Sequence, residues 1–208
     1  MSYPPPHTIN PIIAFQCIAL ALFISVLALL GDWLNPHLLY QREAVFAGQW
    51  WRLLTGHLVH LGVLHGLLNI AGLLMLVAVF PGLLRPVTWW IVGLLLAVGI
   101  SIGFVLIKPE LSFYAGLSGV LHGLFTLLLI VALAQKPFQA NRLLWVVLGL
   151  LLAKLGYEQL PGYSAGYIEQ AMAAPVIVDA HLFGAVLGAI FALAILFIRF
   201  FKQPRSLS

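Results

Sequence analysis

The chain alternates between long apolar segments and shorter connections rich in polar, aromatic and turn-forming residues. Six segments are apolar enough to cross a bilayer as helices, since a spanning helix needs about 20 mostly apolar residues. They cover residues 11–30, 61–80, 87–107, 117–134, 142–156 and 178–201, and residues 142–156 form the shortest of them. The alternating pattern of a membrane barrel is absent. We therefore expect an all-α, polytopic membrane protein with six transmembrane helices, in a single domain covering residues 1–208.

Proline and glycine mark the ends of several segments, as in Pro81-Gly82, Lys136-Pro137 and Pro161-Gly162. Two connections are long, residues 31–60 and 157–177, and both contain many apolar and aromatic residues for loops. Tryptophan and tyrosine concentrate where a membrane meets water. We expect both long connections to lie at the membrane interface.

Composition supports the membrane class. Hydrophobic residues make up 62% of the chain and charged residues only 8%, whereas a soluble domain carries about 25% charged residues. The net charge of +4 comes without a basic run interleaved with aromatics, so nucleic acid is not an expected partner. Cys17 is the single cysteine, which excludes an intramolecular disulfide and a cysteine-based metal site.

The charges divide between the two sides that six spans would create. The side of the termini holds Arg85, Lys136, Arg142, Arg199, Lys202 and Arg205 and no acid. The other side holds Arg42, Arg52, Lys108 and Lys154 together with Asp32, Glu43, Glu110, Glu158, Glu169 and Asp179. The positive-inside rule then places both termini in the cytoplasm.

Polar residues inside the spans gather near the outer end of three of them. His65 and Asn69 lie in the second predicted span, Ser118 and His122 in the fourth, and His181 in the sixth. Such residues are costly inside a membrane and indicate function by default.

Two interpretations fit this cluster. One is acyl-transfer chemistry, which needs a nucleophile, a base and oxyanion donors. Ser118 lies between Gly116 and Gly119 at the start of a helix, where free N–H groups and the dipole favour an oxyanion. The other interpretation is plain helix packing, with His181 hydrogen-bonded in the bundle and His65 and Asn69 forming an interhelical clamp.

Glycine spacing indicates how the fourth and sixth spans meet. Gly184 and Gly188 follow His181 on its helical face, and Gly119 and Gly123 form a similar pair on the serine helix. Small residues four apart let membrane helices approach closely. We expect these two helices to pack tightly and to bring His181 to Ser118.

Four motifs occur in an order that resembles the rhomboid intramembrane proteases. They are Gln49-Trp50-Trp51-Arg52-Leu53-Leu54-Thr55, His60 followed by His65-Gly66-Leu67-Leu68-Asn69, the Gly-Leu-Ser-Gly block at 116–119, and the Ala-His-x-x-Gly-x-x-x-Gly block at 180–188. The resemblance covers nearly the whole chain.

The resemblance implies that Ser118 attacks the scissile carbonyl and that His181 is the general base. His65, Asn69 and the Ser118 N–H would form the oxyanion hole, with Gly116 and Gly119 beside the substrate. The family uses a dyad without a carboxylate to orient the base. We interpret Asp179 as a helix cap or loop residue, and we expect no metal or cofactor.

One departure points to a branch of the family. Many rhomboids have tyrosine four residues after the serine, where this chain has His122, which resembles the rhombosortases. That resemblance implies cleavage of the C-terminal Gly-Gly tail of exported membrane-anchored proteins, in the lipids of the bacterial inner membrane, by a site open to the periplasmic side. His122 would share the base role, bind substrate or stack on His181, and His60 is a second possible modulator.

Three other functions compete with this one. A general rhomboid would cleave other single-span proteins, and an inactive rhomboid-like scaffold would only bind helices. A transporter could use His57, His60 and His65 for zinc, although intramembrane acids, usual in ion paths, are not predicted. A cavity lined by His57, His60, His65 and Asn69 would admit the water that proteolysis needs.

Overall fold

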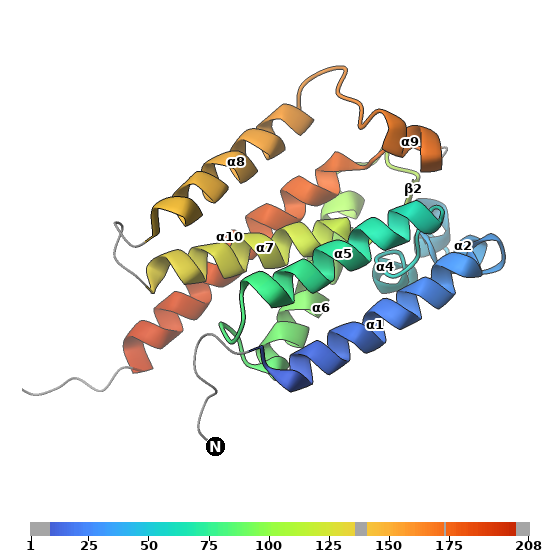
Figure 1. The fold of residues 1–208 in the computed structure, drawn as a ribbon. Coiled ribbons are helices and arrows are strands. Elements are labelled where there is room, and N and C mark those ends of the chain that lie inside the picture. Colours follow the sequence, from blue (N-terminus) through green and yellow to red (C-terminus); the bar gives the residue numbers. More distant parts are fainter. Residues whose placement is uncertain (1–8, 136–140, 173, 203–208) are drawn as a thin grey trace, which may run out of the picture.

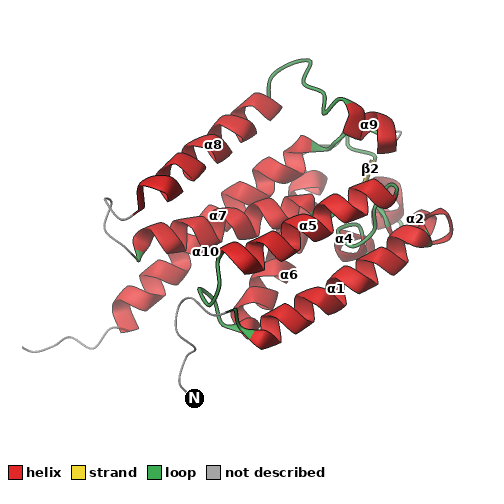
Figure 2. Ribbon diagram, in the orientation of Figure 1, coloured by secondary structure: helices red, strands yellow, loops and turns green. Residues whose placement is uncertain are grey.

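A computed structural model describes residues 9–135, 141–172 and 174–202 of the chain. It is a bundle of long helices with short helices at one end (Figures 1 and 2). The elements in chain order are α1 (Pro11–Leu29), α2 (Gly31–Leu38), β1 (Tyr40–Gln41), α3 (Arg42–Phe46), α4 (Arg52–Thr55), α5 (Val63–Val79), α6 (Pro86–Ile107), β2 (Phe113–Tyr114), α7 (Ser118–Ala134), α8 (Arg142–Glu158), α9 (Tyr167–Met172) and α10 (Val178–Lys202).

The helical, multi-pass membrane class is confirmed. Among the described residues, three helices are long and apolar enough to cross a membrane: Pro11–Leu29, Pro86–Ile107 and Val178–Phe201. Helices α5 and α7 are apolar but shorter, at 17 residues each. Large apolar side chains such as Phe15 and Leu106 are exposed on the outside of the bundle, as lipid contact requires. The count of six spans and the orientation of the termini stay predictions.

Some of the predicted features lie outside the described residues: the Lys136-Pro137 turn and Arg205. The side chain of Lys202 is also not described. The fifth predicted segment, by contrast, is described in full as α8. It ends at Glu158, two residues beyond the predicted end at Gly156, which places Glu158 inside the helix.

The long connection at residues 31–60 is folded rather than irregular. It contains α2, α3 and α4, and its strand β1 pairs antiparallel with β2, with Tyr40 opposite Tyr114. The buried Arg52 guanidinium donates to the carbonyls of Leu39 at 2.7 Å and Pro36 at 2.8 Å. Arg52 therefore fastens α4 to the end of α2.

A second arginine closes the end of α6 that faces this region. Arg42 donates to the carbonyl of Phe104 at 3.2 Å and to that of Val105 at 3.1 Å. The last carbonyls of a helix have no intrahelical donor, so this side chain supplies one. The contact fixes the start of the segment that leads through β2 to α7.

Helices α7 and α10 cross in close contact, as the glycine spacing predicts (Figure 1). A Cβ added to Gly184 would lie 2.0 Å from the Gly119 carbonyl oxygen, and one on Gly188 would lie 2.1 Å from that of Gly123. Only glycine permits this backbone separation. The prediction of tight packing between these two helices is confirmed.

Helix α7 lies at the centre of the bundle and α8 at its edge. Buried residues of α7 include Leu127, Leu128 and Leu129, each fully enclosed. Helix α8 buries only Leu151, Leu155 and Glu158. It follows that α8 is the least anchored of the long helices around α7.

Candidate active site

Ser118 is the first residue of α7 and follows a tight turn. Gly116 has a φ of +128°, and a Cβ there would lie 2.7 Å from the His65 ring. The turn is held by the Tyr114 hydroxyl, which donates to the Gly116 carbonyl at 2.5 Å, and by the Gly116 N–H, which donates to Gly56 at 2.9 Å. The turn therefore sets Ser118 at a helix N-terminus close to His65.

His60 supports the same turn from behind. Its Nε2 accepts from the Leu117 N–H at 3.4 Å, and its ring meets that of His65 edge to face, with centroids 4.9 Å apart. Burial, and secondly the neighbouring His65, lowers the pKa of His60 to about 3. His60 is thus a neutral acceptor that positions the backbone before Ser118.

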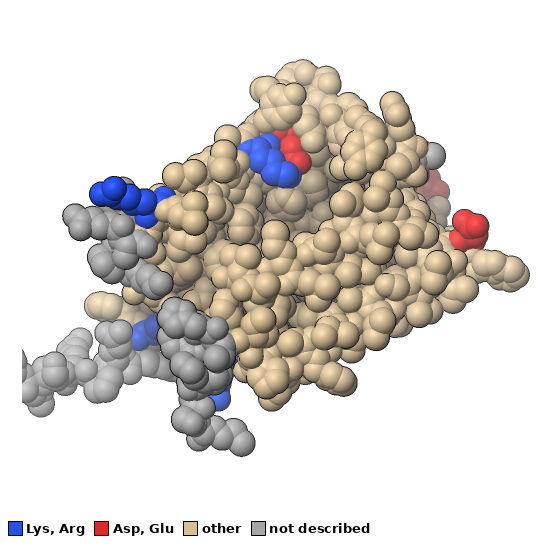
Figure 3. Space-filling view, viewed as in Figure 1, with Lys and Arg blue, Asp and Glu red and all other residues tan. Residues whose placement is uncertain are grey.

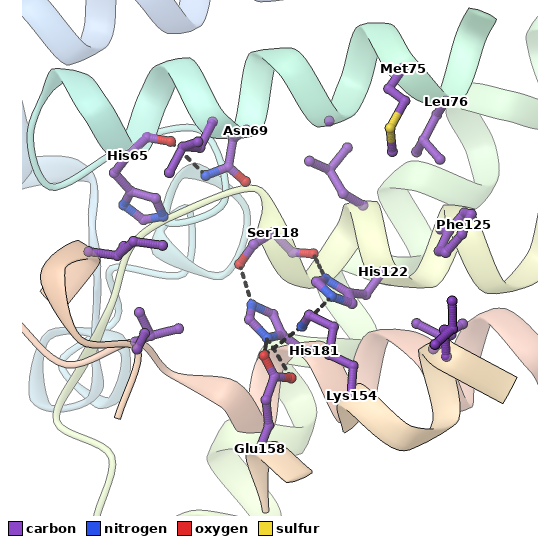
Figure 4. Close-up of a pocket in the computed structure, with 18 of the residues that line it drawn as sticks. His65, Asn69, Met75, Leu76, Ser118, His122, Phe125, Lys154, Glu158 and His181 are labelled. Carbon is purple, nitrogen blue, oxygen red and sulfur yellow. Dashed lines mark hydrogen bonds and ion pairs between the residues drawn. The ribbon is translucent and has the colours of Figure 1, made fainter. Parts of the chain in front are cut away.

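The hydroxyl of Ser118 contacts the His181 ring in the first turn of α10. Ser118 Oγ lies 3.0 Å from His181 Nε2 (Figure 4). His181 Nδ1 lies 3.1 Å from each carboxylate oxygen of Glu158. A carboxylate only accepts hydrogen bonds, so Nδ1 carries the proton and Nε2 is left to accept from the serine hydroxyl. This is the tautomer that a general base requires.

The carboxylate on His181 was not predicted. The family resemblance implies a dyad without an orienting acid, and the expectation that no carboxylate contacts His181 is wrong for this chain, because the buried Glu158 of α8 does so. The spacing of Lys154 and Glu158, four residues apart at the end of an apolar segment, was a usable signal. In the charge pattern both residues appear only among the charges of the outer side.

Lys154 joins Glu158 to His122. Its Nζ lies 2.5 Å from Glu158 Oε1 and 3.0 Å from His122 Nε2. An ammonium group only donates, so His122 Nε2 accepts, and His122 Nδ1–H donates to the Ser118 carbonyl at 2.8 Å.

Of the alternatives for His122, stacking on His181 is what the structure shows. The two rings are parallel within 18°, with centroids 4.1 Å apart. Both nitrogens of His122 are engaged elsewhere than at the serine hydroxyl. This arrangement does not favour a shared base role.

The side chains of Ser118, His181 and Glu158 face a cavity of about 620 Å³ between α5, α7, α8 and α9. Its polar end holds His65, Asn69, Ser118 and His181, and its long apolar part is lined by residues such as Met75, Phe125 and Leu150. In the space-filling view of Figure 3, a basic and an acidic side chain meet beside a hollow in the surface of the molecule.

The predicted lining of the cavity is partly wrong. His65 and Asn69 border it, but His57 and His60 do not, since both are enclosed in the protein. Asn69 donates one amide hydrogen to the His65 carbonyl at 2.9 Å. The second hydrogen of that amide group is not used by this bond.

A second serine–histidine pair lies in the core, and its hydrogen bond runs in the opposite direction, from the histidine to the serine oxygen. Ser101 donates its hydroxyl to the Leu53 carbonyl at 2.7 Å, so His57 Nε2, 3.0 Å from Ser101 Oγ, must donate to it. His57 therefore does not activate Ser101. Within the described residues, His57, His60 and His65 also do not form a group placed to hold a metal ion.

Asp179 does not contact His181. It lies in the first turn of α10, and its carboxylate pairs with Lys108 at 2.9 Å. The interpretation of Asp179 as a helix cap or loop residue is therefore wrong, because it lies within α10, although it is not a partner of His181.

A helical membrane bundle with a serine, a histidine and a carboxylate hydrogen-bonded in a row beside a cavity has the arrangement found in serine hydrolases. The model of the Rhomboid domain matches residues 47–198, which is most of the chain, so the chain belongs to the rhomboid family. This family comprises intramembrane serine proteases, and the family resemblance seen in the motifs is confirmed. The comparison with curated proteins found no match.

Proposed function

We propose that this chain is an intramembrane serine endopeptidase in which Ser118 is the nucleophile and His181 the general base. The observation that carries the proposal is the 3.0 Å contact between Ser118 Oγ and His181 Nε2, in a tautomer set by Glu158. The contact borders a cavity that reaches along the bundle. The family match supports the same chemistry.

The reaction follows from these positions. Ser118 Oγ attacks the scissile carbonyl while His181 Nε2 takes its proton, and the protonated ring then gives that proton to the leaving amine. Water, deprotonated by the same nitrogen, hydrolyses the acyl-serine ester. The product is a carboxylate, and Ser118 regains its proton.

Donors for the oxyanion would come from three groups. The Ser118 N–H belongs to the first residue of a helix, where N–H groups lack intrahelical acceptors and the dipole favours negative charge. His65 and the second amide hydrogen of Asn69 border the same cavity. Gly116 and Gly119 are expected beside the substrate from the family resemblance, but the positions that their Cβ atoms would take are filled by the His65 ring and by Ala180.

The substrate class is proposed to be a single membrane span joined to an exported domain through a Gly-Gly tail. The apolar part of the cavity, between α5 and α8, suits a membrane segment that enters sideways. A helical carbonyl is already hydrogen-bonded, so the substrate must unwind before attack, and glycine lowers the cost of unwinding. The position of His122, as in rhombosortases, supports this class. The site would open to the periplasmic side of the inner membrane.

The first experiment compares purified wild type with Ser118→Ala on a Gly-Gly-tailed substrate in lipid. Loss of the nucleophile should lower the cleavage rate by about 10⁶-fold, below detection. Ser25→Ala is the matched control, because Ser25 donates its hydroxyl to the Ala21 carbonyl of its own helix and, among the described residues, lies away from the cavity. Normal cleavage by Ser118→Ala would disprove the serine-protease mechanism. Labelling of wild type by a fluorophosphonate, lost in Ser118→Ala and in His181→Ala, reports the same pair without a substrate.

The same assay with two leucines in place of the tail glycines tests the substrate class. The proposal expects cleavage to fall strongly, because bulky residues oppose unwinding and close approach to Ser118. Equal cleavage of both tails would assign a general rhomboid instead. Absence of both cleavage and labelling in wild type would indicate a helix-binding scaffold.

A further inference from the structure

Glu158 occupies an unusual place for an acid in this molecule. Its carboxylate is 4% exposed and lies in the last turn of α8, whereas the base that it contacts lies in the first turn of α10. Both of its oxygens lie 3.1 Å from His181 Nδ1. The contact joins residues 23 positions apart in sequence, so it is created by packing and not by local geometry.

A buried carboxylate is costly unless it is paired. Lys154, one turn earlier on the same helix, supplies the pairing cation at 2.5 Å, and its side chain, which is 47% exposed, lines the cavity. Glu158 thus has one partner on its own helix and one on α10. Lys154 holds the carboxylate, and the carboxylate holds the imidazole.

The chain of contacts returns to the nucleophile by a second route. Lys154 donates to His122, His122 donates to the Ser118 carbonyl, and the His122 ring covers one face of His181 (Figure 4). His181 is therefore fixed at its edge by Glu158 and on its face by His122. Rotation of the ring away from Ser118 would break both contacts.

We propose that Glu158 is a positioning residue that fixes the tautomer and orientation of His181, and that Lys154 holds Glu158 for this task. The inference rests on the proposed protease function and deepens it, because it makes the base the middle of a serine–histidine–glutamate row. Glu158 and His181 lie on different helices, so the base is oriented only while α8 stays packed beside α10.

The test is Glu158→Gln in the full-length protein, with kcat and KM measured separately. Glutamine keeps the shape but can offer its amide N–H to Nδ1, which favours the wrong tautomer. A comparable acid-to-amide change in a serine protease costs about 10⁴-fold in kcat, and we expect a fall of about 10²–10⁴-fold in kcat here, with KM changed little. A purely structural role would instead lower thermal stability and leave kcat of the folded fraction unchanged, and that result would overturn the proposal.

Nitrogen NMR of histidine-labelled protein reports which ring nitrogen of His181 carries the proton. A loss of stability alone would not change that tautomer. Wild type should show His181 with its proton on Nδ1, and Glu158→Gln should show the proton on Nε2. Retention of the Nδ1–H tautomer in Glu158→Gln would contradict the inference even if activity falls.

Lys154→Met tests the second half of the proposal. It should lower kcat less than Glu158→Gln, and the double variant should be no slower than Glu158→Gln alone, because both act through one contact. Additive losses would show that Lys154 acts separately. Asp179→Asn is the matched control: it removes an acid two residues before His181 that pairs with Lys108, and kcat should stay near wild type.

These outcomes are distinct from failure of the protease function itself. If wild type and Ser118→Ala are equally inactive, the proposed function fails. If wild type cleaves, Ser118→Ala does not, and Glu158→Gln cleaves as fast as wild type, only the role of Glu158 fails.

Discussion

At the scale of single residues, the turn before Ser118 depends on the absence of a side chain at Gly116. Its φ of +128° is a region that L side chains rarely adopt, and a Cβ would collide with the His65 ring at 2.7 Å. The backbone turn and the proposed oxyanion donor are therefore coupled through one position. Gly116 determines where both Ser118 and His65 lie.

Gly116→Ala should consequently lower both activity and stability. Forcing a non-glycine residue into such a conformation costs about 1–3 kcal/mol, and displacing His65 should lower kcat/KM by about 10²-fold if His65 is an oxyanion donor. The variant is checked by thermal unfolding in detergent and by the fluorophosphonate labelling rate. Gly149→Ala is the control, since a Cβ there meets nothing within 4 Å. Equal labelling rates for the two variants would contradict the prediction.

Part of the candidate site is visible in the sequence at this scale. Ser118, His181, His65 and Asn69 stand out because polar residues are rare in spans, and the structure brings all four to one cavity. The contact of Glu158 with His181 is not visible in the sequence. It depends on which face α8 turns toward α10, and apolar periodicity alone does not give that orientation. The catalytic roles of these residues stay proposals.

At the scale of elements, the contact between α7 and α10 carries the proposed site. Ser118 is the first residue of α7 and His181 lies in the first turn of α10, and the distance between them follows from how closely the two helices cross. Gly184 is the tightest point, with a hypothetical Cβ 2.0 Å from the Gly119 oxygen. Neither backbone can yield without moving a helix.

Gly184→Ala should separate the two helices. Overfilling a packed interior costs about 1–3 kcal/mol, and the wider crossing should lengthen the contact between Ser118 and His181. We expect a lower unfolding temperature and slower fluorophosphonate labelling together. Gly93→Ala, where a Cβ meets nothing within 4 Å, should change neither. Unchanged labelling in Gly184→Ala would show that the crossing does not control the contact.

The long helices were predicted well, and the connections were not. Apolar runs and flanking prolines fixed the long helices within a few residues, as for Pro86–Ile107 against the predicted 87–107. The segment 31–60 was expected as an interfacial loop, but it folds into α2, α3 and α4. Its order comes from tertiary hydrogen bonds, such as those of Arg52 to Pro36 and Leu39, which no local pattern reveals.

At the scale of the whole molecule, successive long helices alternate in direction, so the connections gather at two opposite ends (Figure 1). The end with α2, α4 and α9 also carries the start of α7 and of α10. The opposite end carries Arg85, Arg142 and Arg199, and Arg199 donates to the Leu83 carbonyl at 2.9 Å. This distribution supports the proposed orientation, with the basic end in the cytoplasm.

Two matched glutamine-to-cysteine variants test that orientation. Gln135 at the end of α7 and Gln170 in α9 are both exposed, at opposite ends of the bundle, while the native Cys17 is fully buried. In intact spheroplasts, a membrane-impermeant maleimide should label Gln170→Cys at once, and Gln135→Cys only after the membrane is permeabilised. The wild type, which carries only Cys17, should stay unlabelled until it is denatured. Labelling of Gln135→Cys before permeabilisation, with Gln170→Cys protected, would invert the topology and place the proposed Ser118 site on the cytoplasmic side, where a tail on an exported protein could not reach it.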